Sequence, residues 1–321
     1  MRGTIGSRIL NRSIVKHIPA CGKNRASAGR DYSVIDENRE ENEYLVAADG
    51  YSSEGVMAVI RAVNNLSVSG AATERIMISI VAGEEIKEQT LRTEMQRITE
   101  YASEKGLIIA GGNTVCSGPG EEISFTVTAF GRTKCITDYK PKPGDKIIMY
   151  GSAGEYGANV ICRKNKEKLK ERFSEYYLQC FDFPMEKTDI SEMLIAAADF
   201  GEIMLHDISF GGVYRALYEM AEFSGCGVDI IHENIPIKQS TIELSEYYNI
   251  NPYKLLGTGG ALTIVSPDRV DEIRQLLTGF GRDISVIGEL TADKAMTVRS
   301  ELYNMNRSLT MYDGDEIYKA L

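Results

Sequence analysis

The stretch LVAADGYSSEGVMAVIRAVNNLSVSGA, Leu45–Ala71, decides how the rest of this chain is interpreted. It begins with a buried strand at Leu45–Ala48 and breaks at Asp49-Gly50. Apolar residues then recur at helical spacing up to Gly70. These apolar residues are Val56, Val59, Ile60, Val63 and Leu66. The pattern predicts a strand, a glycine turn and a helix.

Asp49 is the first candidate for a functional side chain. A carboxylate that follows a strand and precedes a glycine lies at an exposed edge, where the chain can meet a ligand. Asn64 and Asn65 come near the far end of the next helix and are expected to face the same cleft. Gly50 and both amides are therefore candidate ligand contacts. The alternative at this stage is a surface turn followed by an ordinary helix end.

The composition is that of an ordinary soluble protein with room for two domains. The chain has 321 residues, of which 43% are hydrophobic and 26% are charged. Its net charge of −10 argues against nucleic acid and anionic membrane partners, because phosphate binding needs clustered cations. No apolar run approaches the roughly 20 residues that span a bilayer. The basic N-terminus lacks the apolar core of a secretory signal.

Cysteine and histidine usage indicates a reducing compartment without a histidine-rich metal centre. The 6 cysteines lie far apart and form no CxxC pair. This is typical of reduced thiols in the cytoplasm rather than of a disulfide framework or a zinc site. With only 3 histidines, a histidine-rich metal centre is not expected.

The segment YKPKPGD, Tyr139–Asp145, predicts a linker, because two prolines and a glycine separate two strand patterns. It divides the chain into domains at 1–140 and 141–321, each mixing strands and helices in the α+β class. Helical patterns lie at 7–18, 88–105, 164–177, 190–200, 211–224 and 269–278. Strand patterns lie at 32–36, 75–82, 107–110, 122–132, 146–150, 203–208, 262–265 and 286–290, with a terminal hairpin at 295–312.

Glycine-rich turns after strands form a second group of candidate ligand contacts. They lie at Gly111-Gly112-Asn113-Thr114, between His206 and Gly212, and at Gly257–Gly260. A glycine pair at a helix N-terminus lets backbone N–H groups approach an anion, where the helix dipole favours negative charge. Each turn alone is equally compatible with a structural role. No GxxxxGK[ST] loop is present, so P-loop chemistry is unsupported.

A small set of side chains has the chemistry of a metal ligand or a catalyst. Asp31 and Asp49 lie beside strands and would suit a magnesium ion that bridges substrate phosphates, although each would equally cap a turn. His206 is a candidate acid or base, with structural hydrogen bonding as its alternative. Cys21 comes two residues before Lys23, so it is either a nucleophile activated by a cation or an incidental thiol.

The order of these motifs resembles the PurM-like superfamily, which includes aminoimidazole ribonucleotide synthetase, selenophosphate synthetase, thiamine monophosphate kinase and HypE-type hydrogenase maturation proteins. The stretch LHDISFGGVYRALYEMAEFSGCGVDI, Leu205–Ile230, looks most like the HypE type. The other matching stretches are GRDYSVID (Gly29–Asp36), LVAADG (Leu45–Gly50), AVNNLSVSGA (Ala62–Ala71), IIAGGNTVCSG (Ile108–Gly118), LLGTGGALTIV (Leu255–Val265) and GEL (Gly288–Leu290). Together they cover nearly the whole chain.

The resemblance implies an N-terminal domain whose sheet pairs with that of a second subunit, and a C-terminal α+β domain. It also implies that ATP lies along the cleft at the dimer interface, held by Mg²⁺ on aspartates of the N-terminal domain. The terminal phosphoryl group of ATP would then activate an acceptor. The task of the protein in such a reaction is positioning and charge neutralisation.

The sequence departs from the family pattern at expected metal ligands. Asn65 and Asn113 stand where the family carries carboxylates, and Tyr32 stands where several members carry small or acidic residues. Each amide removes a charge beside a cation, which weakens metal–nucleotide binding by about one to a few kcal/mol. The chain ends Tyr318-Lys319-Ala320-Leu321, without the cysteine that carries the carbamoyl group in HypE-type proteins, which argues against standard carbamoyl dehydration.

The first hypothesis is a homodimer that binds ATP with Mg²⁺ and transfers a phosphoryl group to a small-molecule or protein acceptor. In this hypothesis Lys23 reaches a phosphate, and His206 and Asp207 line the acceptor side as the catalytic residues. The metal ligands are Asp31, Asp49, Asn65 and Asn113. The nucleotide contacts are Asp49, Gly50, Asn64, Asn65, Gly111, Gly112, Asn113 and Thr114. The second hypothesis is a catalytically degenerate homologue that binds a nucleotide, metabolite or partner protein, because two expected metal carboxylates are amides.

Overall fold

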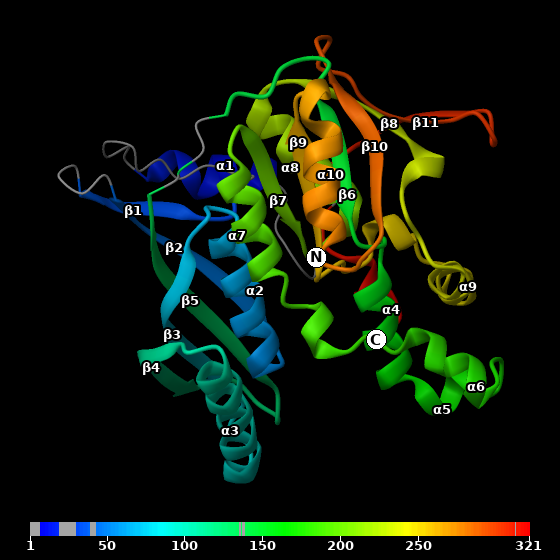
Figure 1. Ribbon diagram of the computed structural model, residues 1–321. Coiled ribbons are helices and arrows are strands. Elements are labelled where there is room, and N and C mark those ends of the chain that lie inside the picture. Colours follow the sequence, from blue (N-terminus) through cyan, green and yellow to red (C-terminus); the bar gives the residue numbers. More distant parts are fainter. Residues whose placement is uncertain (1–6, 19–29, 39–42, 135, 137–138, 312) are drawn as a thin grey trace.

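The chain folds into two β-sheets with helices packed on them (Figure 1). The computed structural model describes residues 7–18, 30–38, 43–134, 136, 139–311 and 313–321. The first sheet has the order β1-β2-β5-β3-β4, in which only β3 and β4 are parallel neighbours. Its strands are β1 (Ser33–Asn38), β2 (Glu43–Ser52), β3 (Ala72–Ala82), β4 (Ile108–Cys116) and β5 (Ile123–Thr133).

The second sheet belongs to the C-terminal half and has the order β12-β11-β8-β10-β6-β9-β7. Its neighbours are antiparallel except for β8 and β11. Its strands are β6 (Lys146–Tyr150), β7 (Ile203–Ile208), β8 (Gly227–Ile231), β9 (Gly260–Val265), β10 (Ile284–Thr291), β11 (Met296–Ser300) and β12 (Met305–Ser308). The two sheets and their helices form the two-domain α+β fold that the sequence predicts.

Helices connect the strands and cover the sheets. They are α1 (Ser7–Ser13), α2 (Gly55–Ser67), α3 (Glu88–Glu104), α4 (Glu155–Lys164), α5 (Lys166–Leu169), α6 (Glu175–Leu178), α7 (Ser191–Phe200), α8 (Gly212–Ser224), α9 (Gln239–Tyr248) and α10 (Val270–Thr278). A short 3-10 turn, η7 (Glu316–Lys319), lies near the C-terminus. Among the described helices, none combines the length and the apolar composition that crossing a membrane requires.

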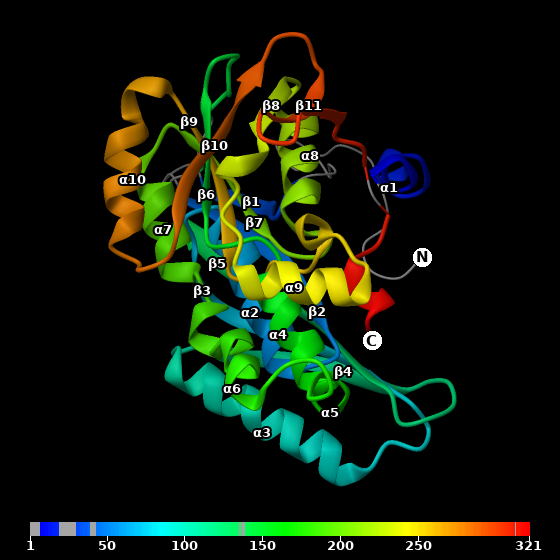
Figure 2. The same ribbon diagram turned by 90° about the vertical axis from the view of Figure 1, so that its right-hand side faces the viewer.

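The second sheet is covered on both faces, by α8 on one side and by α7 and α10 on the other (Figure 2). Strand β6 shows how the sequence produces this arrangement. Ile147 and Met149 join the core beneath α8, whereas Ile148 and Tyr150 join the core beneath α7 and α10. Because successive side chains of a strand point to opposite faces, an uninterrupted apolar run is what a doubly covered strand needs.

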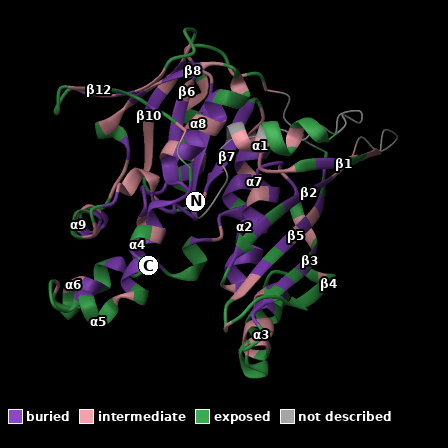
Figure 3. Ribbon diagram, turned by 180° about the vertical axis from the view of Figure 1, so that it is seen from behind, coloured by how far each residue is buried: buried purple, intermediate pink, exposed green. Residues whose placement is uncertain are grey.

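Helix α2 lies between the first sheet and the second domain, and it is buried almost throughout (Figure 3). It packs directly on β2 at Gly50, where an added Cβ would overlap Ala58 O and Ala62 N. The predicted break at Asp49-Gly50 is wrong, since β2 continues to Ser52 in register with β5. The glycine serves the close approach of a helix, not a turn.

The predicted turn at Gly111-Gly112-Asn113-Thr114 is also strand. These residues belong to β4, which runs parallel to β3 with a register shift between Ile76 and Met77. A Cβ on Gly112 would overlap Ile78 O of the neighbouring strand. Glycine is therefore needed here for the approach of two backbones at an irregular point in the ladder.

Most other predicted elements are present, with ends that differ by a few residues. Helix α1 ends at Ser13, before the predicted end at 18. The charged segment 164–177 contains the end of α4, all of α5 and the start of α6, separated by turns, rather than one helical face. The sequence patterns do not reveal β8 or α9. Helix α9 has the sequence QSTIELSEYY, in which apolar residues are too sparse to mark a helical face.

Side-chain contacts join the two domains beside α2 and α3. Asn64 Nδ2 donates to Thr188 O at 2.8 Å, and Asn64 Oδ1 accepts from Ile190 N at 3.0 Å. Asn64 therefore differs from its predicted placement, because both ends of its buried amide hold the second domain instead of facing a cleft. Asp189 of the second domain pairs with Lys105 Nζ at 2.7 Å and accepts from Tyr101 Oη at 2.8 Å.

Gly50→Ala is expected to destabilise the fold. The new methyl group must push α2 away from β2, and overpacking of this kind costs about 1–3 kcal/mol of unfolding free energy. Urea unfolding measures the change. Gly279→Ala is the matched control, since its Cβ would meet only Leu276 O, at 3.3 Å. Equal effects of the two substitutions would contradict the close contact between α2 and β2.

Asp189→Asn is expected to weaken the fold in a pH-dependent way. Burial alone would raise the pKa of Asp189, but hydrogen bonds from Lys105, Ser191 and Tyr101 outweigh it and lower that pKa below its usual 3.8. A depressed pKa contributes stability above the unfolded value, and this contribution is lost as pH falls through the folded value. We expect a cost of about 2 kcal/mol at neutral pH that shrinks below about pH 4.

Urea unfolding over a pH series measures this cost, with exposed Glu222→Gln as the control for loss of one acidic charge. A difference between wild type and Asp189→Asn that stays constant down to pH 2 would show that the Asp189 carboxylate does not provide this stability.

Candidate functional site

Asp31, His206 and Asp207 come together where the two domains meet. One possible ligand atom from each lies within 4.8 Å of the others. Asp31 precedes β1, whereas His206 and Asp207 are consecutive residues of β7. His206 Nδ1 lies 3.4 Å from Asp31 Oδ1, and Asp207 N donates to Asp31 Oδ2 at 3.3 Å. The packing of the first domain on the second sheet builds this cluster.

His206 is buried with acceptors on both sides of its ring. Nδ1 lies 2.6 Å from Asp207 O, and Nε2 lies 3.5 Å from Glu219 Oε2. Arg215 Nε in turn donates to Glu219 Oε1 at 2.8 Å. Burial lowers the pKa of His206, but the charges of Asp31, Glu219 and Asp207 outweigh burial and raise it to about 10. The ring of His206 is therefore protonated at neutral pH, with the Glu219 carboxylate on one side and the acidic groups of Asp31 and Asp207 on the other.

The carboxylates of this cluster are crowded and buried. Burial raises the pKa of Asp31 to about 8, with repulsion from Asp207 and Glu219 adding to it and His206 opposing it. Burial likewise raises the pKa of Asp207 to about 6. Buried carboxylates resist full ionisation unless a cation compensates them. Carboxylate oxygens are the ligands that Mg²⁺ prefers, so Asp31 and Asp207 are suited to a hard divalent cation.

Asp49 lies near the end of β2, and Asn65 approaches it from helix α2. Asn65 Nδ2 donates to Asp49 O at 2.8 Å, while Asn65 Oδ1 is buried without a hydrogen-bond partner in the part of the chain that the structure describes. The exposed Asp49 accepts from Thr128 Oγ1 at 2.6 Å. Pairing of β1 with β2 starts at Ser33 and Ala47, so Asp31 and Asp49 lie at the same end of these two strands.

Asn113 lies apart from these residues within one chain. Across the sheet, Asn113 on β4 pairs with Ser79 on β3, and Ser79 pairs with Thr126 on β5. Thr126 in turn pairs with Tyr51 on β2. Three strand spacings place β4 roughly 14 Å from β2. The predicted nucleotide contacts Gly111, Gly112 and Thr114 share β4 with Asn113. A single chain therefore does not bring Asn113 and Asp49 to one ion.

The Gly211-Gly212 turn before α8 is present as the sequence predicts. Both glycines have left-handed φ values, +83° and +64°. Gly211 N donates to Asp315 Oδ2 at 2.6 Å, and Ile317 N donates to Asp315 Oδ1 at 2.8 Å. The negative group at this helix N-terminus is thus a side chain of the protein itself. Asp315 also accepts from Leu256 N at 3.3 Å, so its carboxylate ties the C-terminal segment to the second domain.

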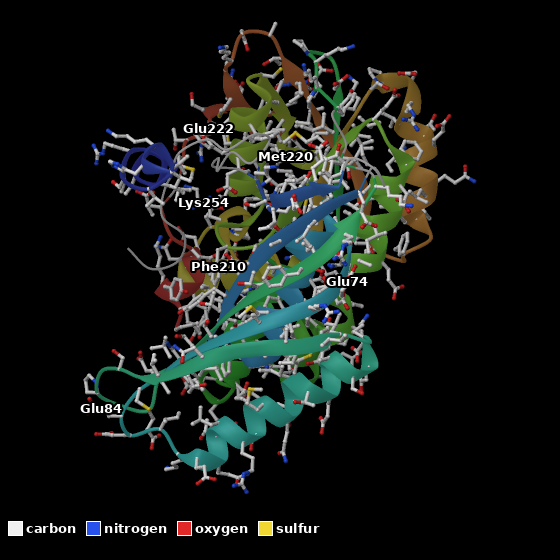
Figure 4. The ribbon with its side chains drawn as sticks, turned by 90° about the vertical axis from the view of Figure 1, so that its left-hand side faces the viewer. Glu74, Glu84, Phe210, Met220, Glu222 and Lys254 are labelled. Carbon is white, nitrogen blue, oxygen red and sulfur yellow. The ribbon has the colours of Figure 1, made fainter. Side chains whose placement is uncertain are left out.

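A cavity of about 1250 Å³ lies next to this junction. Its lining includes Tyr51 and Arg61 from the first domain and Tyr156, Phe210 and Tyr318 from the second. In Figure 4 the labelled Phe210 lies between the strands of the first sheet and the C-terminal segment. The rings of Phe210 and Tyr318 are stacked, with centroids 6.5 Å apart. The volume is sufficient for a nucleotide or another metabolite-sized ligand.

Two predicted site residues lie outside the part of the chain that the structure describes, and some residues of the observed site belong to no sequence motif. Cys21 and Lys23, with the rest of 20–29, lie outside the described residues. The motifs in the sequence do not point to Arg215 and Glu219, although their spacing of four residues on a predicted helix is typical of a paired charge. Arg61 carries the one charge of α2, and this interruption of an apolar pattern is the signal that marks it.

Comparisons with known proteins place the chain in a family. The model for the AIR synthase related protein, N-terminal domain, matches residues 41–133, and that for the C-terminal domain matches residues 142–301. A putative hydrogenase expression/formation protein of Methanocaldococcus jannaschii is 26% identical over 274 residues, 82% of this chain and 77% of the relative. Carbamoyl dehydratase HypE of Rhodobacter capsulatus shows the same identity and coverage.

A solved structure has the same fold. The crystal structure of hydrogenase maturation protein HypE in complex with ATP superposes with a TM-score of 0.71 at 16% sequence identity. The match covers 99% of this chain and 94% of that one. The two-domain arrangement is therefore shared along nearly the whole length of both proteins.

Proposed function

The chain belongs to the AIR synthase related family, and on that premise we propose that it binds ATP with Mg²⁺ and transfers the terminal phosphoryl group to an acceptor. The observation that carries the proposal is the convergence of Asp31 and Asp207 around His206 at the domain junction. Support comes from the shared fold with a HypE protein whose structure contains ATP. Phosphoryl transfer needs positioned groups and charge neutralisation more than covalent chemistry, and this cluster suits that need.

The residues present fit a magnesium ion. Asp31 and Asp207 would hold it through carboxylate oxygens, and Asn65 Oδ1, which has no hydrogen-bond partner among the described residues, is an acceptor of the same kind. When bound, the ion would neutralise charge on the phosphoryl oxygens of the nucleotide. Asp49 contributes its backbone carbonyl to Asn65, whereas its exposed carboxylate accepts from Thr128 on the face of the first sheet away from α2.

His206 acts in this proposal as a positioning residue. Its ring lies between Asp31 and Glu219, and Arg215 holds Glu219 from the other side. The imidazolium therefore fixes Asp31 in one orientation and offsets part of the repulsion among the carboxylates. Burial raises the pKa of Asp207 to about 6, and a magnesium ion bound to its carboxylate would favour the ionised form.

We expect a non-hydrolysable ATP analogue to bind wild type with an affinity that depends on Mg²⁺. Asp31→Asn should weaken that binding at least tenfold, about 1.4 kcal/mol, because it removes a charged ligand from the metal. Titration calorimetry with and without Mg²⁺ measures both effects. Asp271→Asn, an exposed substitution on α10, is the matched control and should leave the affinity unchanged. Binding that ignores Mg²⁺, or survives Asp31→Asn intact, contradicts the proposal.

The degenerate-homologue alternative is favoured by the amides at 65 and 113, and the same titration addresses it. Asn65→Asp with Asn113→Asp restores two negative charges. If the amides weaken the site, the double variant binds the Mg²⁺–nucleotide more tightly and releases phosphate from ATP faster than wild type. Unchanged affinity and turnover would remove the reason for the alternative.

We also propose that the outer face of the first sheet packs against a second copy of the chain. Among the described residues no helix covers this face, and large apolar side chains on three of its strands are between 43% and 52% exposed. They are Tyr51 on β2, Met77 and Val81 on β3, and Ile108 and Val115 on β4. An exposed apolar patch of this kind is typical of an interaction surface.

Met77→Arg is expected to convert the protein from a dimer to a monomer, because it places a charge in the centre of the proposed interface. Light scattering after gel filtration should give twice the 35.5 kDa chain mass for wild type and one chain mass for the variant. Leu302→Arg changes another exposed apolar residue, in the second domain, and should leave the dimer intact. A monomeric wild type would exclude this interface.

A further inference from the structure

Arg61 carries a buried charge whose orientation is fixed by both domains. The residue is 5% exposed. Its Nη1 donates to Tyr51 O at 2.6 Å, and its Nε donates to Thr258 Oγ1 at 3.4 Å. The guanidinium also lies over the ring of Phe210, with Cζ 4.3 Å from the centroid. These contacts hold the plane of the guanidinium but supply no negative charge.

No carboxylate forms an ion pair with Arg61 among the residues that the structure describes. Asp207 and Asp315 act on Arg61 only through longer-range attraction, which partly offsets the lowering of its pKa by burial. Asp315 accepts three backbone N–H groups instead, and Asp207 belongs to the cluster with Asp31. Arginine stays protonated in proteins. A buried guanidinium without a counter-charge is costly, so its retention calls for an anion.

The cavity next to the junction gives an anion access to this group. Arg61 lines the cavity, whereas Asp31, His206 and Asp207 do not. We propose that Arg61 binds the oxyanion group, a carboxylate or a phosphoryl group, of the acceptor molecule that enters this cavity. The guanidinium offers planar, paired N–H donors that match both of these groups. The Nη2 group, which donates to no acceptor within the described residues, is available for such a bond.

The other charges around the cavity do not offer the same site. Glu54 lines the wall, but its carboxylate pairs with Arg163 at 3.2 Å. Glu122 is exposed, and Lys164 is an exposed cation that water already solvates. The charge of Arg61 is shielded from water, so a bound anion would replace the solvation that the guanidinium loses on burial.

This inference rests on the proposed function in taking the ligand to be the acceptor. The acceptor is then a small molecule with a carboxylate or phosphoryl group, and Arg61 binds this group rather than the nucleotide. Binding is therefore tested with anions alone, without ATP or Mg²⁺. A failure of anion binding is then distinct from a failure of nucleotide binding.

Titration of wild type with inorganic phosphate and, separately, with acetate should show binding of at least one of the two, and the preference identifies the oxyanion. Arg61→Gln should weaken that binding tenfold or more, and Arg61→Lys should retain part of it, since lysine keeps the charge without the paired donors. Lys164→Gln removes one positive charge from the same cavity and should change binding less than twofold. Arg61→Gln should leave Mg²⁺-dependent binding of the ATP analogue within twofold of wild type.

A second measurement on wild type alone covers the case in which Arg61→Gln does not fold. The Nε–Hε resonance of Arg61, assigned from the Arg61→Lys spectrum, should shift on addition of the anion that binds. The inference is overturned if neither anion binds wild type, if Arg61 and Lys164 substitutions weaken binding equally, or if the Arg61 resonance stays unmoved. It is also overturned if Arg61→Gln loses the ATP analogue, because Arg61 would then belong to the nucleotide site.

Discussion

The close approach of α2 to β2 at Gly50 is the constraint on which the rest of the structure depends. With no side chain at that position, the helix lies directly on the sheet, against the backbone of Ala58 and Ala62. The opposite face of α2 contacts the second domain. Asn64 on that face binds the backbone at Thr188 and Ile190. The packing of α2 on the sheet at Gly50 and the contacts of Asn64 therefore link the first sheet to the second domain through one helix.

The junction between the two domains has an acidic cluster on one side and a buried arginine on the other. On one side, Asp31 and Asp207 lie close to His206, and burial raises the pKa of both carboxyl groups. On the other side, Arg61 is buried without an anion in an ion pair among the described residues. Such groups are costly in a folded protein unless they are compensated. In the proposed function the acidic side would hold a divalent cation and Arg61 an oxyanion, the two kinds of group that a phosphoryl-transfer site has to hold.

Local sequence patterns predicted most strands and helices, and they were least informative at glycines. Gly50, Gly112 and the Gly211-Gly212 pair all follow apolar strand residues, yet only the last forms a turn. Glycine is favoured both where a turn requires a positive φ and where a close backbone contact leaves no room for a Cβ. The sequence does not distinguish these two uses, since the overlapping atoms of Ala58, Ala62 and Ile78 belong to other elements.

The sequence by itself determined the two-domain α+β class, because apolar runs and alternation are local and decide which segments become strands. It also determined the identity of the acidic residues at strand ends and, through the order of its motifs, the family. Only the tertiary structure decided that Asp31 meets Asp207 across 176 positions of sequence, that Asn64 joins the domains, and that Arg61 is buried beside a cavity. These placements depend on sheet pairing and on the packing of one domain against the other. Such contacts form between segments far apart in the chain, so no local pattern encodes them.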